Sequence, residues 1–292
     1  MTGMTRAQAT GPVLVVGASG TLGAAITAAL ERQGRRVFRA SRRGDAETVG
    51  LDLAKNAEAW PLPAGIVVAH LCAAVTSIAD CRDQPDAARA VNVEGIFTLA
   101  RRLVAAGSRI VFPSTNMVFA GDQPFARHDA PRSPQTAYGR MKAEAERRLL
   151  DLGEGVRVVR LSKVLARRVP LFENWRTALA AGAPIHPIAD MVIAPVSLAR
   201  AADALIRAGD DGAGRIIHLS ATGDVSYAEV ARRLAVIMHV DAELVQPRTV
   251  AEAGLVVEHT PRHTTLDMSR VEAAIGIGAP DPWQAIEEAL AP

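Results

Sequence analysis

Short runs of apolar residues alternate along the first half of the chain with longer stretches in which apolar positions recur every three or four residues. Six of the runs predict strands, namely PVLVV (12–16), RRVFRAS (35–41), TVGLDL (48–53), GIVVAHLCAA (65–74), SRIVFPST (108–115) and GVRVVRLS (155–162). Helical spacing predicts helices over residues 20–34, 85–107 and 137–152. Apolar strands that alternate with helices are typical of a parallel sheet covered on both faces. The sequence therefore predicts an α/β fold with a doubly wound parallel sheet.

The alternation becomes less regular after about residue 165. Helical spacing recurs around 171–182, at 197–208 and at 226–238, and a strand is predicted at 215–220, after a proline-rich segment at 184–195. This pattern is too irregular for a second doubly wound domain. We expect a larger domain over residues 11–165 and a smaller α/β lobe over residues 166–292, from which some segments could return to the larger domain.

Composition narrows the functional class. Hydrophobic residues make up 49% of the chain, enough for a sizeable core, and the charge balance of 33 basic against 31 acidic residues leaves +2. So small an excess does not indicate a nucleic-acid or membrane partner. Two cysteines suggest neither a disulfide framework nor a metal site, and no run of 18 apolar residues indicates a membrane helix. We expect a cytoplasmic protein without a metal that acts on a small molecule.

Three glycines stand between the first predicted strand and the first predicted helix, in VLVVGASGTLG. Gly17 permits a tight turn, Gly20 lets phosphate groups approach the backbone, and Gly23 lets helix and strand pack closely. The following helix offers free N–H groups and a partial positive charge to a pyrophosphate. In this βαβ context the glycines predict a Rossmann-type dinucleotide loop rather than an incidental turn. The spacing G-x-x-G-x-x-G resembles the short-chain dehydrogenase/reductase superfamily, particularly its extended branch.

The end of the second predicted strand bears on the choice of cofactor. Sites that prefer NAD carry an acidic residue there for the ribose 2′-hydroxyl, whereas this chain has Ser41, Arg42 and Arg43. Arginine pairs with phosphate through its planar fork of donors, so we predict NADP rather than NAD. The alternative is that both arginines only solvate the tip of a loop. Asp45 is a possible acidic competitor, although it lies farther into the loop.

Two further segments are candidates for cofactor contacts. Asp52 and Leu53 resemble the acidic–apolar pair that meets adenine in this superfamily, although a helix N-cap explains Asp52 nearly as well. The fourth predicted strand ends in the small residues Cys72, Ala73 and Ala74, where the backbone could lie against the cofactor ribose.

Tyr138 and Lys142 are four residues apart on a predicted helix and therefore share one face. A nearby ammonium and a position in the first helical turn would both favour the phenolate, so we expect a lowered tyrosine pKa. Such a tyrosine can exchange a proton with a substrate oxygen beside a nicotinamide. Ser114 and Thr115 end the fifth predicted strand, where a parallel sheet places its ligands. A hydroxyl there could bind a substrate carbonyl and complete a Thr–Tyr–Lys set.

The resemblance extends to one family within the superfamily. The segments AVNVEGIFTLARRL, STNMVFAGDQPF, SPQTAYGRMKAEAE, VVRLSKVL and PRHTTLDMSRVEAAIGI resemble, in this order, those of dTDP-4-dehydrorhamnose reductase and its relatives, over about residues 11–290. The family combines an NADP-binding Rossmann domain with a small C-terminal substrate lobe. The resemblance implies catalytic roles for Thr115, Tyr138 and Lys142. It implies cofactor contacts for the glycine loop and for the end of the sixth strand, comprising Gly17, Ser19, Gly20, Thr21, Leu22, Gly23, Leu161 and Ser162.

The chain departs from this family at positions that face the substrate. Asn116 and Met117 replace the usual Asp-Tyr after the catalytic threonine, Lys163 replaces a tryptophan after Ser162, and Val75 replaces a tyrosine. We therefore expect these four residues to line an altered substrate pocket. Related 4,6-dehydratases need an Asp-Glu pair after the threonine, so Asn116 and Met117 disfavour that activity. Lys163 could bind a substrate phosphate or lie on the surface.

The expected function is NADP-dependent reduction of a carbonyl, with a nucleotide-linked 4-keto sugar as the expected substrate. An NAD-dependent sugar-nucleotide epimerase remains open, as does a non-catalytic NADP-binding regulatory subunit like that of methionine adenosyltransferase. A homodimer is possible. Phe172 and Trp175 could stack on a nucleotide base, although core packing is the better interpretation, and Asp190 could contact substrate or form a turn.

Overall fold

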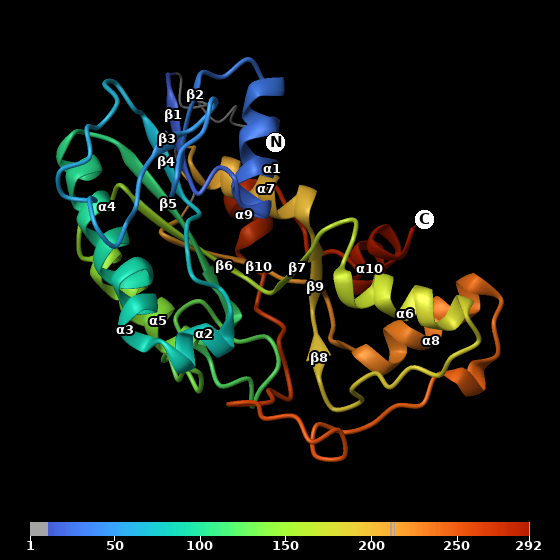
Figure 1. Ribbon diagram of the computed structural model, residues 1–292. Helices are drawn as coiled ribbons and strands as arrows, with labels where there is room; N and C mark the ends of the chain where they lie inside the picture. The colour runs from blue at the N-terminus through green and yellow to red at the C-terminus, as the bar shows by residue number, and fades with distance from the viewer. Residues whose placement is uncertain (1–10, 211, 213, 292) are drawn as a thin grey trace.

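The computed structural model describes residues 11–210, 212 and 214–291, and a seven-stranded parallel sheet forms its centre (Figure 1). From one edge to the other the strands are β10 (Ile216–Leu219), β6 (Val156–Leu161), β5 (Arg109–Thr115), β4 (Val68–Leu71), β1 (Val13–Val16), β2 (Val37–Ser41) and β3 (Val49–Gly50). The order reverses between β1 and β4, and ligands of open α/β sheets bind at such a switch point. The predicted doubly wound α/β fold is confirmed.

Helices cover both faces of the sheet. On one face lie α4 (Ile96–Ala105) and α5 (Ala137–Leu150), and on the other lie α1 (Thr21–Arg32), α7 (Leu198–Ala208) and α9 (Val271–Ile275). Alternate strand residues serve the two cores: Val13 and Val15 pack toward α1 and α7, whereas Leu14 and Val16 pack toward α4. Because both faces are buried, the central strands β1, β4 and β5 are largely apolar, which is why continuous apolar runs located them in the sequence.

The predicted helix over residues 85–107 is interrupted. The structure has α3 (Pro85–Arg89), a π-helical turn η1 (Ala90–Gly95) and then α4, and an unpredicted helix α2 (Ile78–Asp83) precedes them. Gly95 is the last residue of the π turn, and a side chain is excluded there because a Cβ would lie 2.2 Å from the Leu53 carbonyl oxygen. The third strand is also shorter than predicted, since backbone N–H groups of Lys55 and Asn56 bond to the Asp52 carbonyl and turn the chain.

The smaller lobe has its own core. It contains α6 (Pro170–Ala180), α8 (Tyr227–Met238), α10 (Pro282–Leu290), a short 3₁₀ turn η3 (Ala242–Leu244) and two pairs of strands, β7 (Lys163–Leu165) with β9 (Pro195–Ser197) and β8 (Val192–Ile193) with β11 (Val225–Ser226). Phe172 and Trp175 are buried in this core, with ring centroids 5.5 Å apart. Core packing is therefore the correct interpretation of both aromatic residues.

Several segments of the second half of the chain return to the sheet. β10 pairs with β6, and α7 and α9 cover one face. Figure 1 also shows the orange chain after η3 running from the lobe back toward α2 and α5, where Leu266 bridges to Ala126. Among the described residues no helix is long and apolar enough to cross a membrane.

Candidate active site

The glycine loop is shaped by contacts that exclude side chains. Gly17 has φ +83°, and a Cβ on it would lie 2.7 Å from the backbone nitrogen of Ala73. A Cβ on Gly23 would lie 2.2 Å from the Gly17 carbonyl oxygen. Helix α1 begins at Thr21 without a side-chain cap, and Ser19, Gly20 and Thr21 are exposed, whereas Leu22 is partly buried. The backbone of the loop is closely packed, its outer residues are exposed, and the first N–H groups of α1 have no side-chain cap. This arrangement suits the binding of a pyrophosphate.

The end of β2 presents two basic side chains to solvent. Ser41 is buried and its Oγ accepts a hydrogen bond from the backbone of Gly44 at 3.2 Å, which fixes the start of the loop. Arg42 and Arg43 are exposed, and neither makes a hydrogen bond or ion pair with any residue that the structure describes. The Asp45 carboxylate accepts the N–H groups of Glu47 and Thr48, each at 2.8 Å. It is therefore engaged in its own turn, while both arginines are available.

The two other candidate cofactor segments take different positions. Asp52 Oδ1 accepts the Ala54 N–H at 3.1 Å, so the carboxylate caps a turn, and Leu53 is buried beneath it. The partly buried run of Cys72, Ala73 and Ala74 follows β4 and lies directly against Gly17. The glycine loop and the end of β4 therefore form one surface at the carboxyl edge of the sheet.

Lys142 is buried beneath that edge. Its side chain is 3% exposed, its Nζ donates to the Pro113 carbonyl at 2.5 Å, and it lies 3.8 Å from the ring centroid of Phe112. Burial lowers the pKa of Lys142 to about 7, and the carboxylate of Glu146 acts in the opposite direction. The ammonium is thus fixed to β5 two residues before Thr115.

Tyr138 lies in the first turn of α5. The Thr136 side chain caps this turn by accepting the Gly139 N–H at 3.0 Å, and a Cβ on Gly139 would lie 2.3 Å from the Met117 carbonyl oxygen. The helix therefore begins in contact with η2 (Asn116–Val118), the turn that follows Thr115. Tyr138 packs with Cys81 and other apolar residues.

The expected lowering of the Tyr138 pKa is wrong for the protein without ligands. Burial is the dominant cause and raises the pKa of the hydroxyl above its usual value, with a smaller contribution from Cys81. The sequence showed Lys142 one turn away, but it did not show that the apolar cluster around Cys81 partly buries the phenol. At neutral pH Tyr138 is accordingly a neutral phenol.

Thr115, the third of the proposed catalytic residues, is the last residue of β5. The residue is buried, and its Oγ1 accepts the Met117 N–H at 3.2 Å and lies 3.4 Å from Oδ1 of Asn116. Its strand neighbour is Leu161, the last residue of β6. The structure therefore brings Thr115, Tyr138 and Lys142 to the carboxyl edge of one strand.

The candidate substrate residues surround this edge. Val75 is held by Asn92, whose amide accepts the Val75 N–H at 2.8 Å and donates to its carbonyl at 2.9 Å. Asn92 is thus a structural hydrogen-bonding residue. Ser162 Oγ donates to the Ala194 carbonyl at 2.5 Å, so this side chain joins the two lobes. Lys163 remains accessible to solvent, and its partial desolvation lowers its pKa.

A small cavity of about 30 Å³ adjoins the site between the loop after β5 and the segment that returns from the lobe. Its polar walls include Asn116, Gln123, Gln135, Thr136, His259 and His263. His259 Nε2 donates to the Ala120 carbonyl at 2.6 Å, and His263 lies 3.6 Å from the Asp224 carboxylate. Neither histidine was recognised from the sequence as part of the site.

A buried ionic network behind the site was also missed. Glu146 is fully buried and accepts bonds from Ser114 at 2.5 Å and from Nη2 of Arg160 at 2.8 Å. Arg132 reaches the same carboxylate at 3.2 Å. The only signal in the sequence was the spacing, because Glu146 follows Lys142 by one helical turn and so shares its face.

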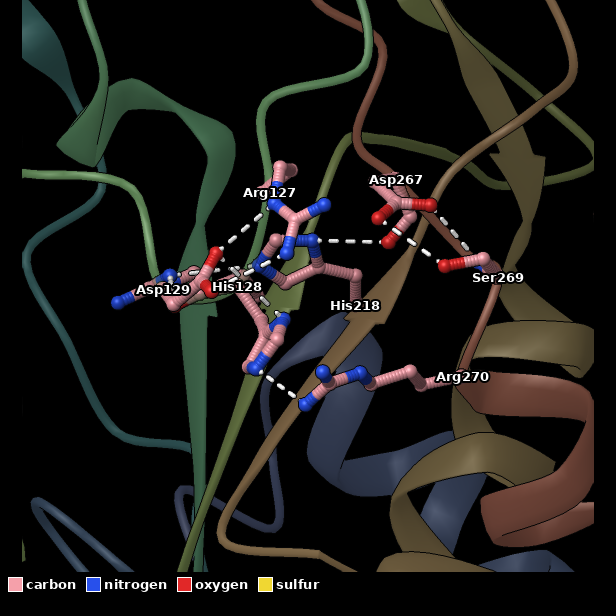
Figure 2. A network of polar contacts seen from close by, with 8 residues as sticks. Arg127, His128, Asp129, His218, Asp267, Ser269 and Arg270 are labelled. Carbon is pink, nitrogen blue, oxygen red and sulfur yellow. Dashed lines mark hydrogen bonds and ion pairs between the residues drawn. The ribbon is translucent and has the colours of Figure 1, made fainter.

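The network continues to the C-terminal segment (Figure 2). Arg160 contacts Nε2 of His218 at 3.3 Å, and Nδ1 of His218 donates to the Asp267 carbonyl at 3.1 Å. Burial and the Arg160 charge lower the pKa of His218 to about 3, so the ring is neutral. Figure 2 shows His128 directed toward Arg270, at 2.8 Å. Asp267 thus connects the LDMSR segment to the strand below the site.

Comparison with known proteins gives concordant results. A sequence model of the family described as RmlD substrate binding domain matches residues 11–292. A dTDP-4-dehydrorhamnose reductase of Streptomyces griseus is 33% identical over 283 residues, covering 93% of this chain and 90% of that protein.

Two solved structures share the fold. A dTDP-4-dehydrorhamnose reductase of Bacillus anthracis in complex with NADP gives a TM-score of 0.80 at 20% identity, covering 96% of this chain and 98% of that one. A UDP-glucose 4-epimerase of Thermotoga maritima with UDP-glucose gives a TM-score of 0.79 at 16% identity, covering 96% and 97%. At these identities the two structures establish a likeness of fold alone.

Proposed function

Because the chain belongs to the RmlD substrate-binding-domain family, whose members include nucleotide-sugar reductases, we propose that it reduces the carbonyl of a nucleotide-linked 4-keto sugar with NADPH. The observation that carries this proposal is the meeting of Thr115, Tyr138 and Lys142 at the carboxyl end of β5, beside the glycine loop. Extended short-chain dehydrogenase/reductases of this family act through a nicotinamide cofactor.

The residues present fit such a dinucleotide. Gly17 and Gly23 leave space that a Cβ would fill, and α1 offers its N–H groups to the pyrophosphate. Arg42 and Arg43 would hold a 2′-phosphate, and the small residues after β4 would lie against the ribose. When bound, the cofactor supplies the hydride.

The proposed roles of the three catalytic residues follow from their environments. Tyr138 is a neutral phenol, so it donates a proton to the oxygen of the carbonyl being reduced. Thr115 orients that oxygen by donating its hydroxyl hydrogen, which in the structure points to Oδ1 of Asn116 at 3.4 Å, while its Oγ1 keeps the Met117 N–H. Lys142 holds the ribose and stabilises the phenolate that forms after proton transfer.

Replacing Tyr138 with Phe tests this proposal. The variant keeps the packing of the ring and loses only the proton donor, so kcat should fall by at least about 100-fold, the scale of general acid catalysis. Its dissociation constant for NADPH, measured by calorimetry, should stay within twofold of that of the unchanged protein. A variant that retained most of its turnover on the identified keto sugar would refute the mechanism.

Two alternatives differ in measurable ways. An epimerase would retain NAD through purification, so identifying the nucleotide released on denaturation separates it from a reductase with exchangeable NADP. A regulatory subunit would form a stable complex with a larger enzyme and reduce no keto sugar. The complete set of Thr115, Tyr138 and Lys142 argues against a purely regulatory role.

A further inference from the structure

The segment that returns from the lobe brings a single carboxylate, that of Glu258, to the start of α5. The side chain of Glu258 is 14% exposed, and its Oε1 accepts the backbone N–H of Ala137 at 3.0 Å. Ala137 directly precedes Tyr138. A residue of the smaller lobe is therefore bound to the first turn of the helix that carries the proposed proton donor.

The other carboxylate oxygen of Glu258 has no such partner. Oε2 is buried and makes no hydrogen bond to any residue that the structure describes. Arg140, the nearby cation, is 57% exposed and approaches Oε1 at 3.6 Å. Capping of α5 and pairing with Arg140 thus account for one oxygen only. A buried acceptor without a donor is costly, so a donor from outside the chain, either a ligand hydroxyl or a water molecule, would be stabilised at Oε2.

Neighbouring groups place this carboxylate on the substrate side of the site. After burial and Asp80, the charge of Glu258 also contributes to raising the pKa of the Cys81 thiol in α2. That thiol donates to the Val75 carbonyl at 3.4 Å. Cys81 also packs in one cluster with Tyr138 and Val75. Glu258 therefore lies between α2 and the start of α5, next to the residues that are expected to face the reacting sugar.

We propose that Oε2 of Glu258 accepts a hydrogen bond from a hydroxyl group of the substrate's sugar ring, which makes Glu258 a specificity-determining residue supplied by the smaller lobe. Carboxylates are strong acceptors for hydroxyl groups. The same charge disfavours a sugar that carries its own carboxylate, because two anions would then meet in a poorly solvated site. The inference rests on the proposed function, since it assumes a sugar beside Tyr138.

Binding measurements on the Tyr138→Phe background test the inference without turnover. The probes are UDP-glucose, dTDP-glucose and deoxy analogues of each that lack one ring hydroxyl, titrated by calorimetry in the presence of NADP. Glu258→Gln preserves an oxygen for the Ala137 N–H and removes the charged acceptor. We expect affinity for the parent sugar to fall about tenfold or more, and affinity for one deoxy analogue to be unchanged by the substitution.

Arg140→Met is the matched control, because it removes the ion pair and leaves the carboxylate in place. It should leave the preference among the sugars unchanged. Affinities that fall equally for all analogues, or not at all, in Glu258→Gln would overturn the inference while leaving the reductase proposal intact. A protein that binds no nucleotide sugar before any change at Glu258 would overturn both.

Discussion

The hydroxyl of Ser114 donates a hydrogen bond of 2.5 Å to Oε1 of Glu146. One turn earlier on the same helix, Lys142 donates to the carbonyl of Pro113. Helix α5 is thus fastened to β5 at two successive residues, immediately before Thr115. The position of the proposed catalytic groups depends on this double attachment, and the Glu146 carboxylate favours the charged form of Lys142.

Glu146→Gln should shift the pH dependence of the reaction. The Glu146 carboxylate favours the charged form of Lys142 against the effect of burial, so its loss should lower the Lys142 pKa further. The decline of kcat/KM on the alkaline side should therefore move to lower pH, by about one unit. Profiles measured from pH 5 to 10 for both proteins give the comparison.

Glu144→Gln is the control on the same helix, because Glu144 pairs with the surface residue Arg89. Its profile should match that of the unchanged protein. If Glu146→Gln lowered activity equally at every pH, its role would be limited to holding the helix in place.

The two arginines after β2 should decide between NADPH and NADH. Removing both side chains in Arg42→Ala/Arg43→Ala deletes the donors for a 2′-phosphate, and bonds to charged groups of this kind contribute about 1.5–3 kcal/mol each. The dissociation constant for NADPH should therefore rise at least tenfold, whereas that for NADH should change less than twofold.

Arg36→Ala provides the matched loss of charge at the opposite end of the same strand, where Arg36 lies 4.8 Å from the ring centroid of Phe38. It should leave both constants unchanged. If the dissociation constants for NADPH and NADH rose equally in the double variant, the two arginines would contribute only a general positive potential and would not recognise the 2′-phosphate.

Buried His70 should make stability fall in weak acid. The ring is 1% exposed on β4, and Nδ1 has no hydrogen-bond partner among the residues described. Burial, with a contribution from Arg35, lowers the pKa of His70 to about 3 from an ordinary value of 6.5. Between pH 3 and pH 6.5, His70 is protonated in the unfolded chain but neutral in the folded protein. Stability is therefore full above pH 6.5 and falls toward pH 3, by about 1.4 kcal/mol per pH unit for each such group.

Urea unfolding at pH 6.5 and pH 5 measures this slope. His70→Asn should reduce the loss between the two pH values, whatever it does to absolute stability, and His239→Asn at an exposed position should not. His218, whose pKa is also about 3, should keep a residual slope in both variants. An unaltered slope in His70→Asn would show that other groups cause the acid sensitivity.

The sequence identified the parts of the site that depend on local pattern. The glycine loop, the strand ends and the Tyr138–Lys142 spacing were all visible, because each requirement lies within a few consecutive residues. The parallel, doubly wound sheet followed from the βαβ alternation, whereas the order of its strands came from the structure. Preference for NADP stays a prediction. The structure leaves Arg42 and Arg43 exposed and available for a 2′-phosphate, but availability alone does not test which cofactor binds.

What the sequence did not show depends on contacts between distant segments. Glu146 and Arg160 look like surface charges one at a time, and only the fold buries them together. Glu258 reaches Ala137 across 121 positions, so no local pattern could reveal it. The predicted direction of the Tyr138 pKa was wrong for the same reason, since residues that pack with Tyr138 and partly bury it come from α2 and from the loop after β4.

The place of β10 at the edge of the sheet has a consequence for biosynthesis. When residues 11–165 have left the ribosome, every strand of the large sheet has been synthesised except β10, which pairs with the free edge of β6. Until residue 219 emerges, β6 presents unpaired backbone groups and buried-type side chains such as Val158, and an exposed edge of this kind invites pairing with other chains. The large sheet can therefore be completed only after β7, α6, β8 and β9 of the smaller lobe have been synthesised.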